Sequence, residues 1–221
     1  MEDQDKNKIK IAGLLTIKAW KDLEDIVNSS TNKNWENAFN FFEQRITTRY
    51  LNPIHKILNM NLSTGEGFAV VNLQCSLIET IECFYNGWIY EKSDYKKNGA
   101  VVKYPIGSND KMKNKHVFEN FFKEREPFKK VNIDGKSFYQ DVRCALLHET
   151  QTKNGWVIRD KHYDRFYEEI EGEKIIYRTN FQTSIETVIG KYKKDIVEGE
   201  AASKDLHENF KAKLNHICKV S

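Results

Sequence analysis

The chain has 221 residues, of which 39% are hydrophobic and 30% charged, a composition typical of a soluble globular protein rather than a disordered or fibrous one. Its 35 lysines and arginines nearly balance its 32 aspartates and glutamates, so bulk charge does not indicate a nucleic-acid binder, and an anionic partner would need a local patch. Only 3 prolines and 11 glycines occur, which favours long helices and a mainly α fold.

The cysteines and the start of the chain indicate its surroundings. The four cysteines show no Cys-x-x-Cys motif and no cysteine/histidine cluster at metal-ligand spacing, so we expect neither a metal nor a cofactor. The first residues are acidic and lack the features of a secretion signal, and no run of about 18 apolar residues predicts a membrane span. We therefore expect reduced thiols in a cytoplasmic protein that does not contact a membrane.

Two helices are predicted in the first quarter of the chain. Apolar residues at helical spacing predict the first helix over 9–27. From Trp35 to Tyr50 they recur at steps of three and four, which predicts an amphipathic helix that ends or kinks near Pro53, because proline lacks a backbone N–H. We expect an N-terminal helix and linker over 1–35 and one larger helical domain over 36–221.

Residues 66–90 predict a central helix that is apolar over most of its girth. One narrow polar stripe remains along it, formed by Asn72, Ser76, Glu79, Cys83 and Asn86. Because buried polar groups need partners, this stripe predicts either a structural hydrogen-bond network or the wall of an active site.

The second half of the chain predicts short elements before its last helices. The stretch 91–115 is rich in Lys, Asn and Gly and indicates a long connection with an extended piece at 100–104. A short helix follows over 116–125, and Ser137 stands where an N-cap is expected for the next helix.

A small β-hairpin is then expected at about 156–178, built from Trp156-Val157-Ile158 and Lys174-Ile175-Ile176-Tyr177. Two further helices are predicted, over 181–197 and 201–217.

The segment that suggests chemistry is Asp141-Val142-Arg143-Cys144-Ala145-Leu146-Leu147-His148. In an ideal helix the side chains of Arg143 and His148 diverge by about 140°, so they converge only if the helix breaks after Leu147 or a second copy supplies the complement. An imidazole can move a proton near neutral pH and a guanidinium can hold a phosphate. The pair therefore suits metal-free RNA cleavage through attack of the 2′-hydroxyl.

A structural interpretation of the same residues stays open. Arg143 can simply pair with Glu79, Glu82 or Asp141, and His148 can interact with the C-terminal end of its helix.

The Arg-x4-His spacing of Arg143 and His148, within Ser137–Gly155, resembles the signature helix of the HEPN superfamily. Gly65-Glu66-Gly67 and the following helix resemble the preceding long helix of the same core, and the similarity to bacterial members covers 36–197. This resemblance implies a mainly α, up-down helical bundle that dimerises through the motif helix. It also implies a metal-independent endoribonuclease, active in bacterial defence or as a toxin, with Arg143 and His148 as the catalytic pair.

The remaining site predictions come from the same motif. We expect Glu79 beside Arg143, and Lys153 and Asn154 either in contact with RNA phosphate or ribose or in an ordinary turn. The expected partners are RNA, a second copy of the chain and a cognate antitoxin or defence protein. Cys144 departs from the family, whose active members often carry a polar residue there. That departure favours the alternative, a non-catalytic dimer that binds a partner protein or a nucleotide.

Overall fold

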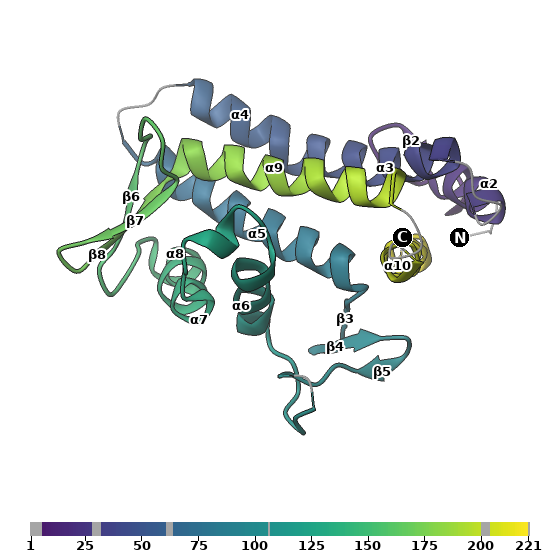
Figure 1. Cartoon of the computed structure of the whole chain (residues 1–221). Helices are drawn as coiled ribbons and strands as arrows, with labels where there is room; N and C mark the ends of the chain where they lie inside the picture. The colour runs from purple at the N-terminus through teal and green to yellow at the C-terminus, as the bar shows by residue number, and fades with distance from the viewer. Residues whose placement is uncertain (1–5, 28–31, 61–63, 106, 200–203, 221) are drawn as a thin grey trace. The chain divides into compact units, whose positions relative to one another are not determined.

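The structure is a computed structural model that describes residues 6–27, 32–60, 64–105, 107–199 and 204–220 (Figure 1). Helices dominate these residues and the strands form small sheets, so the prediction of a mainly α fold is confirmed. Two compact units divide the chain, the first comprising 1–52, 83–102 and 191–221 and the second 53–82 and 103–190. Helices α5 (Glu66–Asn86) and α9 (Arg178–Val197) contribute residues to both. The boundary expected at residue 35 stays a prediction.

The first unit begins with a two-stranded hairpin instead of the expected helix. Strands β1 (Lys10–Ala12) and β2 (Leu15–Thr16) pair antiparallel around Gly13, whose φ of +57° favours glycine. Helix α2 (Ile17–Val27) starts only after them, so the prediction of a helix from residue 9 is wrong for 10–16. The reason is local, because the left-handed turn at Gly13 reverses the chain before a helix can begin.

The next helix passes through Pro53 by changing its hydrogen-bond pattern. Helix α3 (Asn32–Ile46) continues into a π-helical turn, Thr47–Leu51, and then into α4 (Asn52–Asn59). The backbone N–H of Asn52 donates to the carbonyl of Thr47, five residues back. The backbone of Pro53 cannot donate a hydrogen bond, so we interpret this wider π-helical turn as the helix interruption expected near Pro53.

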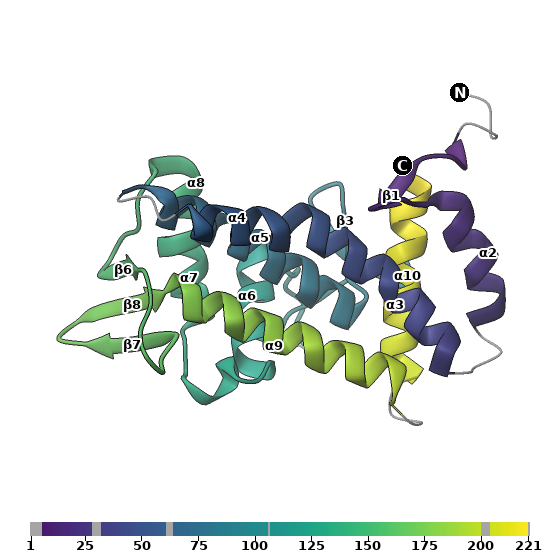
Figure 2. The ribbon, with the colours of Figure 1, turned by 90° about the horizontal axis from the view of Figure 1, so that it is seen from above.

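Buried aromatic rings from α3, α5, α9 and α10 (Lys204–Val220) form the core of the first unit, in which α10 lies beside α2 and α3 (Figure 2). The ring centroids of Phe42 and Phe84 are 4.7 Å apart, those of Phe84 and Phe210 5.6 Å, and those of Phe39 and Tyr192 5.7 Å. Each such pair contributes about 0.5–1.5 kcal/mol beyond its buried area.

A three-stranded antiparallel sheet replaces part of the long connection expected over 91–115. Its strands are β3 (Ile89–Glu91), β4 (Asp94–Lys97) and β5 (Ala100–Val101), in that order. Both of its turns, Lys92-Ser93 and Asn98-Gly99, consist of two residues with positive φ. Such two-residue turns match the twist of a hairpin, so the Asn98-Gly99 pair is a sequence feature that indicates a hairpin here.

The second unit contains α6 (Asn114–Glu124), a 3-10 turn (Phe128–Lys130) and a helical run made of α7 (Gly135–Phe138), a π-helical turn (Tyr139–Cys144) and α8 (Ala145–Glu149). The short helix expected over 116–125 is confirmed. A Cβ added at Gly135 would lie 2.5 Å from the Cα of Glu119, so α7 packs directly on the backbone of α6. Phe122, Phe138 and Phe181 fill the core between the helices.

The strands expected near 156–178 exist, but their pairing corrects the prediction. Strand β6 (Trp156–Arg159) runs parallel to β8 (Glu173–Tyr177), and β7 (Tyr167–Ile170) pairs antiparallel with β8. The sheet order is β6-β8-β7, so the hairpin is formed by β7 and β8 and not by the two expected strands. The charged segment between them supplies the missing strand, which sequence alternation did not reveal.

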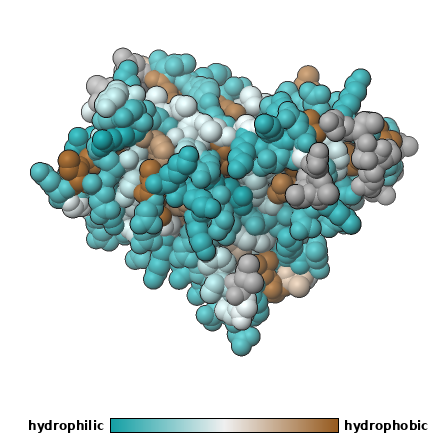
Figure 3. Space-filling model, viewed as in Figure 1, coloured by the Kyte–Doolittle hydropathy of each residue, from teal (hydrophilic) through white to brown (hydrophobic). Residues whose placement is uncertain are grey.

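The face drawn in Figure 3 is mostly hydrophilic, with small separate hydrophobic areas. The exposed apolar side chains of the second unit include Phe68 on α5 at 43% exposure and Leu147 on α8, within the motif, at 52%. Among the helices that the structure describes, none combines the length and apolarity that a membrane crossing requires.

Candidate functional site around the motif helix

The motif helix begins one turn earlier than Ser137 suggests. Its N-cap is Asp134, whose Oδ1 accepts hydrogen bonds from the backbone N–H groups of Lys136 at 3.0 Å and Ser137 at 3.2 Å. The prediction that Ser137 is the cap is therefore wrong. An aspartate just before Gly135 meets the same need for an acceptor, and its charge also suits the positive end of the helix dipole.

Ser137 instead belongs to a network centred on the buried carboxylate of Asp141. Its Oγ donates to Asp141 Oδ2 at 3.0 Å and accepts from Nε1 of Trp156 at 3.0 Å. The other carboxylate oxygen of Asp141 accepts from Nδ2 of Asn154 at 2.8 Å, and its carbonyl accepts from the backbone N–H of Lys153 at 2.9 Å. The network ties the turn at 153–155 to the motif helix, which agrees with the structural interpretation of Asn154.

Arg143 lies in the π-helical turn and pairs with Glu79 of α5. Its Nε donates to Glu79 Oε1 at 3.0 Å, and the two side chains are 23% and 22% exposed. Its guanidinium also lies 5.8 Å from the centroid of the Tyr139 ring. The terminal Nη atoms have no hydrogen-bond partner among the described residues. The structure thus brings Glu79 and Arg143 together as expected and leaves one side of the guanidinium available.

Burial and charge act in opposite directions on this pair. Burial raises the pKa of Glu79 above its ordinary value, although the charge of Arg143 and its hydrogen bond lower it. Burial lowers the pKa of Arg143, but the Glu79 carboxylate and Tyr139 more than offset this and leave it raised. Arg143 therefore keeps its charge at any physiological pH, while burial leaves the pKa of Glu79 raised despite the opposing effect of Arg143.

Two weakly acidic side chains surround the arginine. Burial, followed by a hydrogen bond with the thiol of Cys144, raises the pKa of Tyr139 to about 12. Burial, with the charge of Glu79, also raises the pKa of Cys75, so this thiol stays protonated. Neither group adds negative charge near Arg143 at neutral pH.

His148 stands apart from these contacts. It is exposed in the last turn of α8, which ends at Thr150 in the left-handed region with a φ of +58°. The imidazole has no hydrogen-bond or ion-pair partner within the described part of the chain. Lys153, the next predicted contact, pairs with Glu149 at 3.0 Å in an exposed ion pair. The structure therefore does not bring the predicted residues together in one cluster within a single chain.

The residues of the polar stripe on α5 also do not form one cluster. Glu79 contacts Arg143, whereas Ser76 is exposed and bonds back to the carbonyl of Asn72. The most buried carboxylate of this helix lies outside the stripe: Glu82 accepts from Nε and Nη2 of Arg125 at 2.8 and 3.0 Å and from Asn120 at 2.5 Å. The stripe thus supplies one residue, Glu79, to the candidate site.

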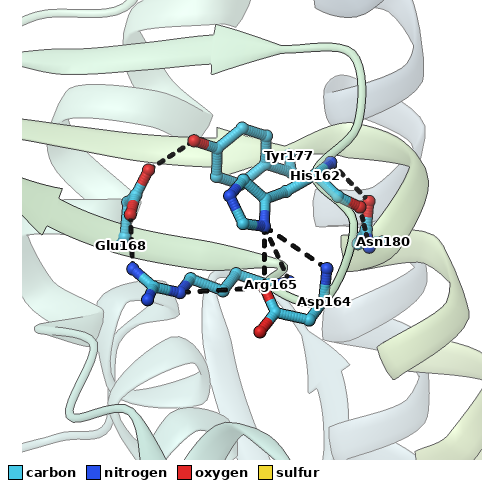
Figure 4. Close-up of polar contacts among 6 residues, drawn as sticks. All are labelled: His162, Asp164, Arg165, Glu168, Tyr177 and Asn180. Carbon is cyan, nitrogen blue, oxygen red and sulfur yellow. Dashed lines mark hydrogen bonds and ion pairs between the residues drawn. The ribbon is translucent and has the colours of Figure 1, made fainter.

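A second polar cluster was not singled out from the sequence, and Figure 4 shows it. Nδ1 of His162 lies 2.8 Å from Oδ1 of Asp164, and the backbone N–H groups of Asp164 and Arg165 point to the same nitrogen at 3.3 Å. The side chain of Asn180 brackets the backbone of His162, accepting from its N–H at 3.0 Å and donating to its carbonyl at 2.8 Å.

The other half of this cluster is centred on Glu168 of β7. The hydroxyl of Tyr177 donates to Glu168, and Nη1 of Arg165 donates to its other carboxylate oxygen at 2.8 Å. These bonds lower the pKa of Glu168, the Tyr177 hydrogen bond most. The contacts join a loop, two strands and the start of α9, so no sequence spacing reveals them. These contacts connect the β6–β7 loop to the sheet, so their role is structural.

Within the described residues, no group of three or more His, Cys, Asp or Glu side chains is placed to hold a metal ion. No family model, curated protein or solved structure matches the chain. The candidate site is therefore judged by its own geometry.

Proposed function

We propose that the chain is a metal-independent endoribonuclease of the HEPN type, with Arg143 and His148 as its catalytic pair. The observation that carries the proposal is the state of Arg143. Glu79 engages its Nε alone, and the terminal nitrogens have no partner among the described residues. A guanidinium oriented by a carboxylate and open on its outer edge is suited to bind a phosphate with two parallel hydrogen bonds.

His148 supplies the proton chemistry in this proposal. An exposed imidazole without a partner in the described chain can take the proton from a ribose 2′-hydroxyl. The 2′-oxygen then attacks the phosphorus, the bond to the 5′-oxygen breaks, and the leaving oxygen receives a proton from a protonated His148 imidazole. The products are a 2′,3′-cyclic phosphate and a free 5′-hydroxyl, and Arg143 stabilises the charge on the phosphate oxygens.

Two copies of the chain complete the site in this proposal. Within one helix Arg143 and His148 point in different directions, so each needs its complement from another motif helix. Leu147, half exposed directly before His148, offers an apolar contact for that partner. Lys153 and Asn154 are fixed to the motif helix by Glu149 and Asp141, where they can meet the sugar-phosphate backbone next to the cleaved bond.

A specific observation favours the alternative, a non-catalytic dimer that binds a nucleotide or a partner protein. Glu79 neutralises Arg143, and the neighbouring Cys144 is a weak hydrogen-bond donor where a stronger polar group could contact a substrate. Under this alternative the motif helix keeps its architecture but does not cut RNA.

The test compares the wild type with Arg143→Ala and His148→Ala on mixed tRNA, rRNA and mRNA in EDTA. We expect cleavage with cyclic-phosphate ends, reduced about 10²–10⁴-fold without His148 and about 10²–10³-fold without Arg143. His55→Ala, which removes another exposed histidine of the second unit, is the matched control and should keep full activity. No cleavage of any RNA by folded wild-type protein would refute the nuclease and favour the alternative.

A further inference from the structure

A pocket of about 600 Å³ lies in the first unit, between the segment before β1, helix α2 and helix α10. Its size is within the range of about 300–1,000 Å³ that is usual for small-molecule sites. Its walls carry three lysines, Lys6, Lys21 and Lys219, together with Trp20, Glu24 and Asn215. All belong to the first unit and none to the motif helix, so binding in this pocket does not depend on the proposed ribonuclease.

The pocket carries an excess of positive charge. Three ammonium groups line it against the single carboxylate of Glu24. Nζ of Lys21 donates to Oδ1 of Asn7 at 3.1 Å, a neutral acceptor, and Lys21 forms no ion pair with a described residue. Lys219 has no hydrogen-bond or ion-pair partner among the residues that the structure describes. An anion entering the pocket therefore meets two lysines, Lys21 and Lys219, that form no ion pair within the described residues.

The pocket wall is held by a chain of hydrogen bonds. Nε1 of Trp20 donates to Oδ1 of Asn215 at 2.7 Å, and the side-chain amide of Asn215 donates to Glu24. Glu24 is thus engaged within the wall, and the buried side chains of Trp20 and Ile17 lie behind it. Burial, followed by the charge of Glu24, raises the pKa of the lining Cys218 to about 11, so this thiol adds no negative charge near neutral pH.

A smaller hollow adjoins the pocket and extends its basic character. It shares Asn7 with the pocket and is lined further by Lys8, Thr16 and Lys18. Lys18 is paired with Asp22 at 2.9 Å, so its charge is compensated. In the described part of the chain, the pocket lysines shown without an ion pair are therefore Lys21 on α2 and Lys219 on α10.

We propose that this pocket binds a small phosphorylated molecule of about mononucleotide size. Lysine ammonium groups bind phosphate as point charges from several directions, which suits three lysines carried by different segments. The pocket volume of about 600 Å³ leaves room for the rest of the ligand. The pocket thereby joins the two ends of the described chain around one ligand, and binding stabilises the packing of α2 against α10.

The test follows the indole N–H resonance of Trp20 by NMR, assigned by its loss in Trp20→Phe, during titration with AMP, inorganic phosphate and adenosine. We expect a saturable shift with AMP, a weaker response to phosphate and no shift with adenosine. The double variant Lys21→Gln/Lys219→Gln should bind AMP at least about tenfold more weakly, since it lacks two charge-assisted contacts. Lys194→Gln, an exposed helical lysine of the same unit, is the matched control and should bind as the wild type does.

Three outcomes would overturn the proposal. If adenosine shifted the resonance as much as AMP does, the pocket would not recognise phosphate. If Lys194→Gln lost as much affinity for AMP as the double variant does, the loss would be due to the net charge of the protein and not to contacts in the pocket. The absence of any shift at millimolar AMP, with folded protein, would mean that the pocket binds no such ligand.

Discussion

The Glu79–Arg143 pair permits a test in which pH separates charge from packing. Arg143→Ala removes the cation that pairs with Glu79. The Glu79 side chain is only 22% exposed, and it lies on a helix whose other face is buried. Exposed ion pairs contribute about 0.2–1 kcal/mol, and breaking fully buried ones costs about 3–5 kcal/mol. For a pair of intermediate burial we expect a loss of about 2 kcal/mol in the free energy of unfolding at pH 8.

This loss should depend on the protonation of Glu79. Burial already raises the pKa of Glu79, and removing Arg143 removes the group that lowers it. A carboxyl group with a raised folded pKa contributes stability that is present below its ordinary pKa of 4.5 and is lost as the pH rises through the folded value. The penalty of Arg143→Ala should therefore shrink as the pH falls from 8 toward 4.5. Glu79→Gln, which mimics the protonated carboxyl, should relieve the penalty at pH 8.

The measurement is urea unfolding, followed by circular dichroism, of the wild type, both single variants and the double variant at pH 5 and pH 8. The expected loss corresponds to a decrease in melting temperature of about 4–8 °C for a chain of this length. A loss below about 0.5 kcal/mol, or an equal loss at both pH values, would refute the reasoning from burial. A double variant as unstable as Arg143→Ala would show that lost packing, and not the unpaired carboxylate, causes the effect.

Three further results are expected. Glu82→Ala should cost about 3–5 kcal/mol in urea unfolding, because it leaves the bound arginine and asparagine without their buried acceptor; a loss below 1 kcal/mol would contradict this. Gly135→Ala should lower the melting temperature, since its Cβ would meet the backbone of α6, whereas Gly190→Ala, with open space around it, should raise it slightly. Burial lowers the pKa of His207, so stability should fall as the pH drops below its ordinary value of 6.5, and His207→Gln should weaken that dependence between pH 7 and pH 5.

Periodic patterns predicted the helices well because the period of apolar residues is a local property. The steps of three and four from Trp35, and the apolar girth of 66–90, correspond to α3 and α5. The same reasoning failed where a turn decides the structure. The left-handed residue Gly13 starts a hairpin in place of a helix, and β7 pairs within a charged segment that shows no alternation. In both places the structure is decided by a turn or by strand pairing, which the period of apolar residues does not indicate.

The amino-acid sequence alone is enough to predict a mainly helical protein, the position of its motif helix and three possible acidic partners for Arg143. The tertiary structure assigns a different partner to each of these carboxylates. Glu82 binds Arg125, Asp141 binds Asn154, and Glu79 alone is left for Arg143. Helical periodicity predicts which face of a helix carries each carboxylate. The packing of segments distant in sequence decides which donor each one meets, because a hydrogen bond or ion pair requires proximity that no local spacing encodes.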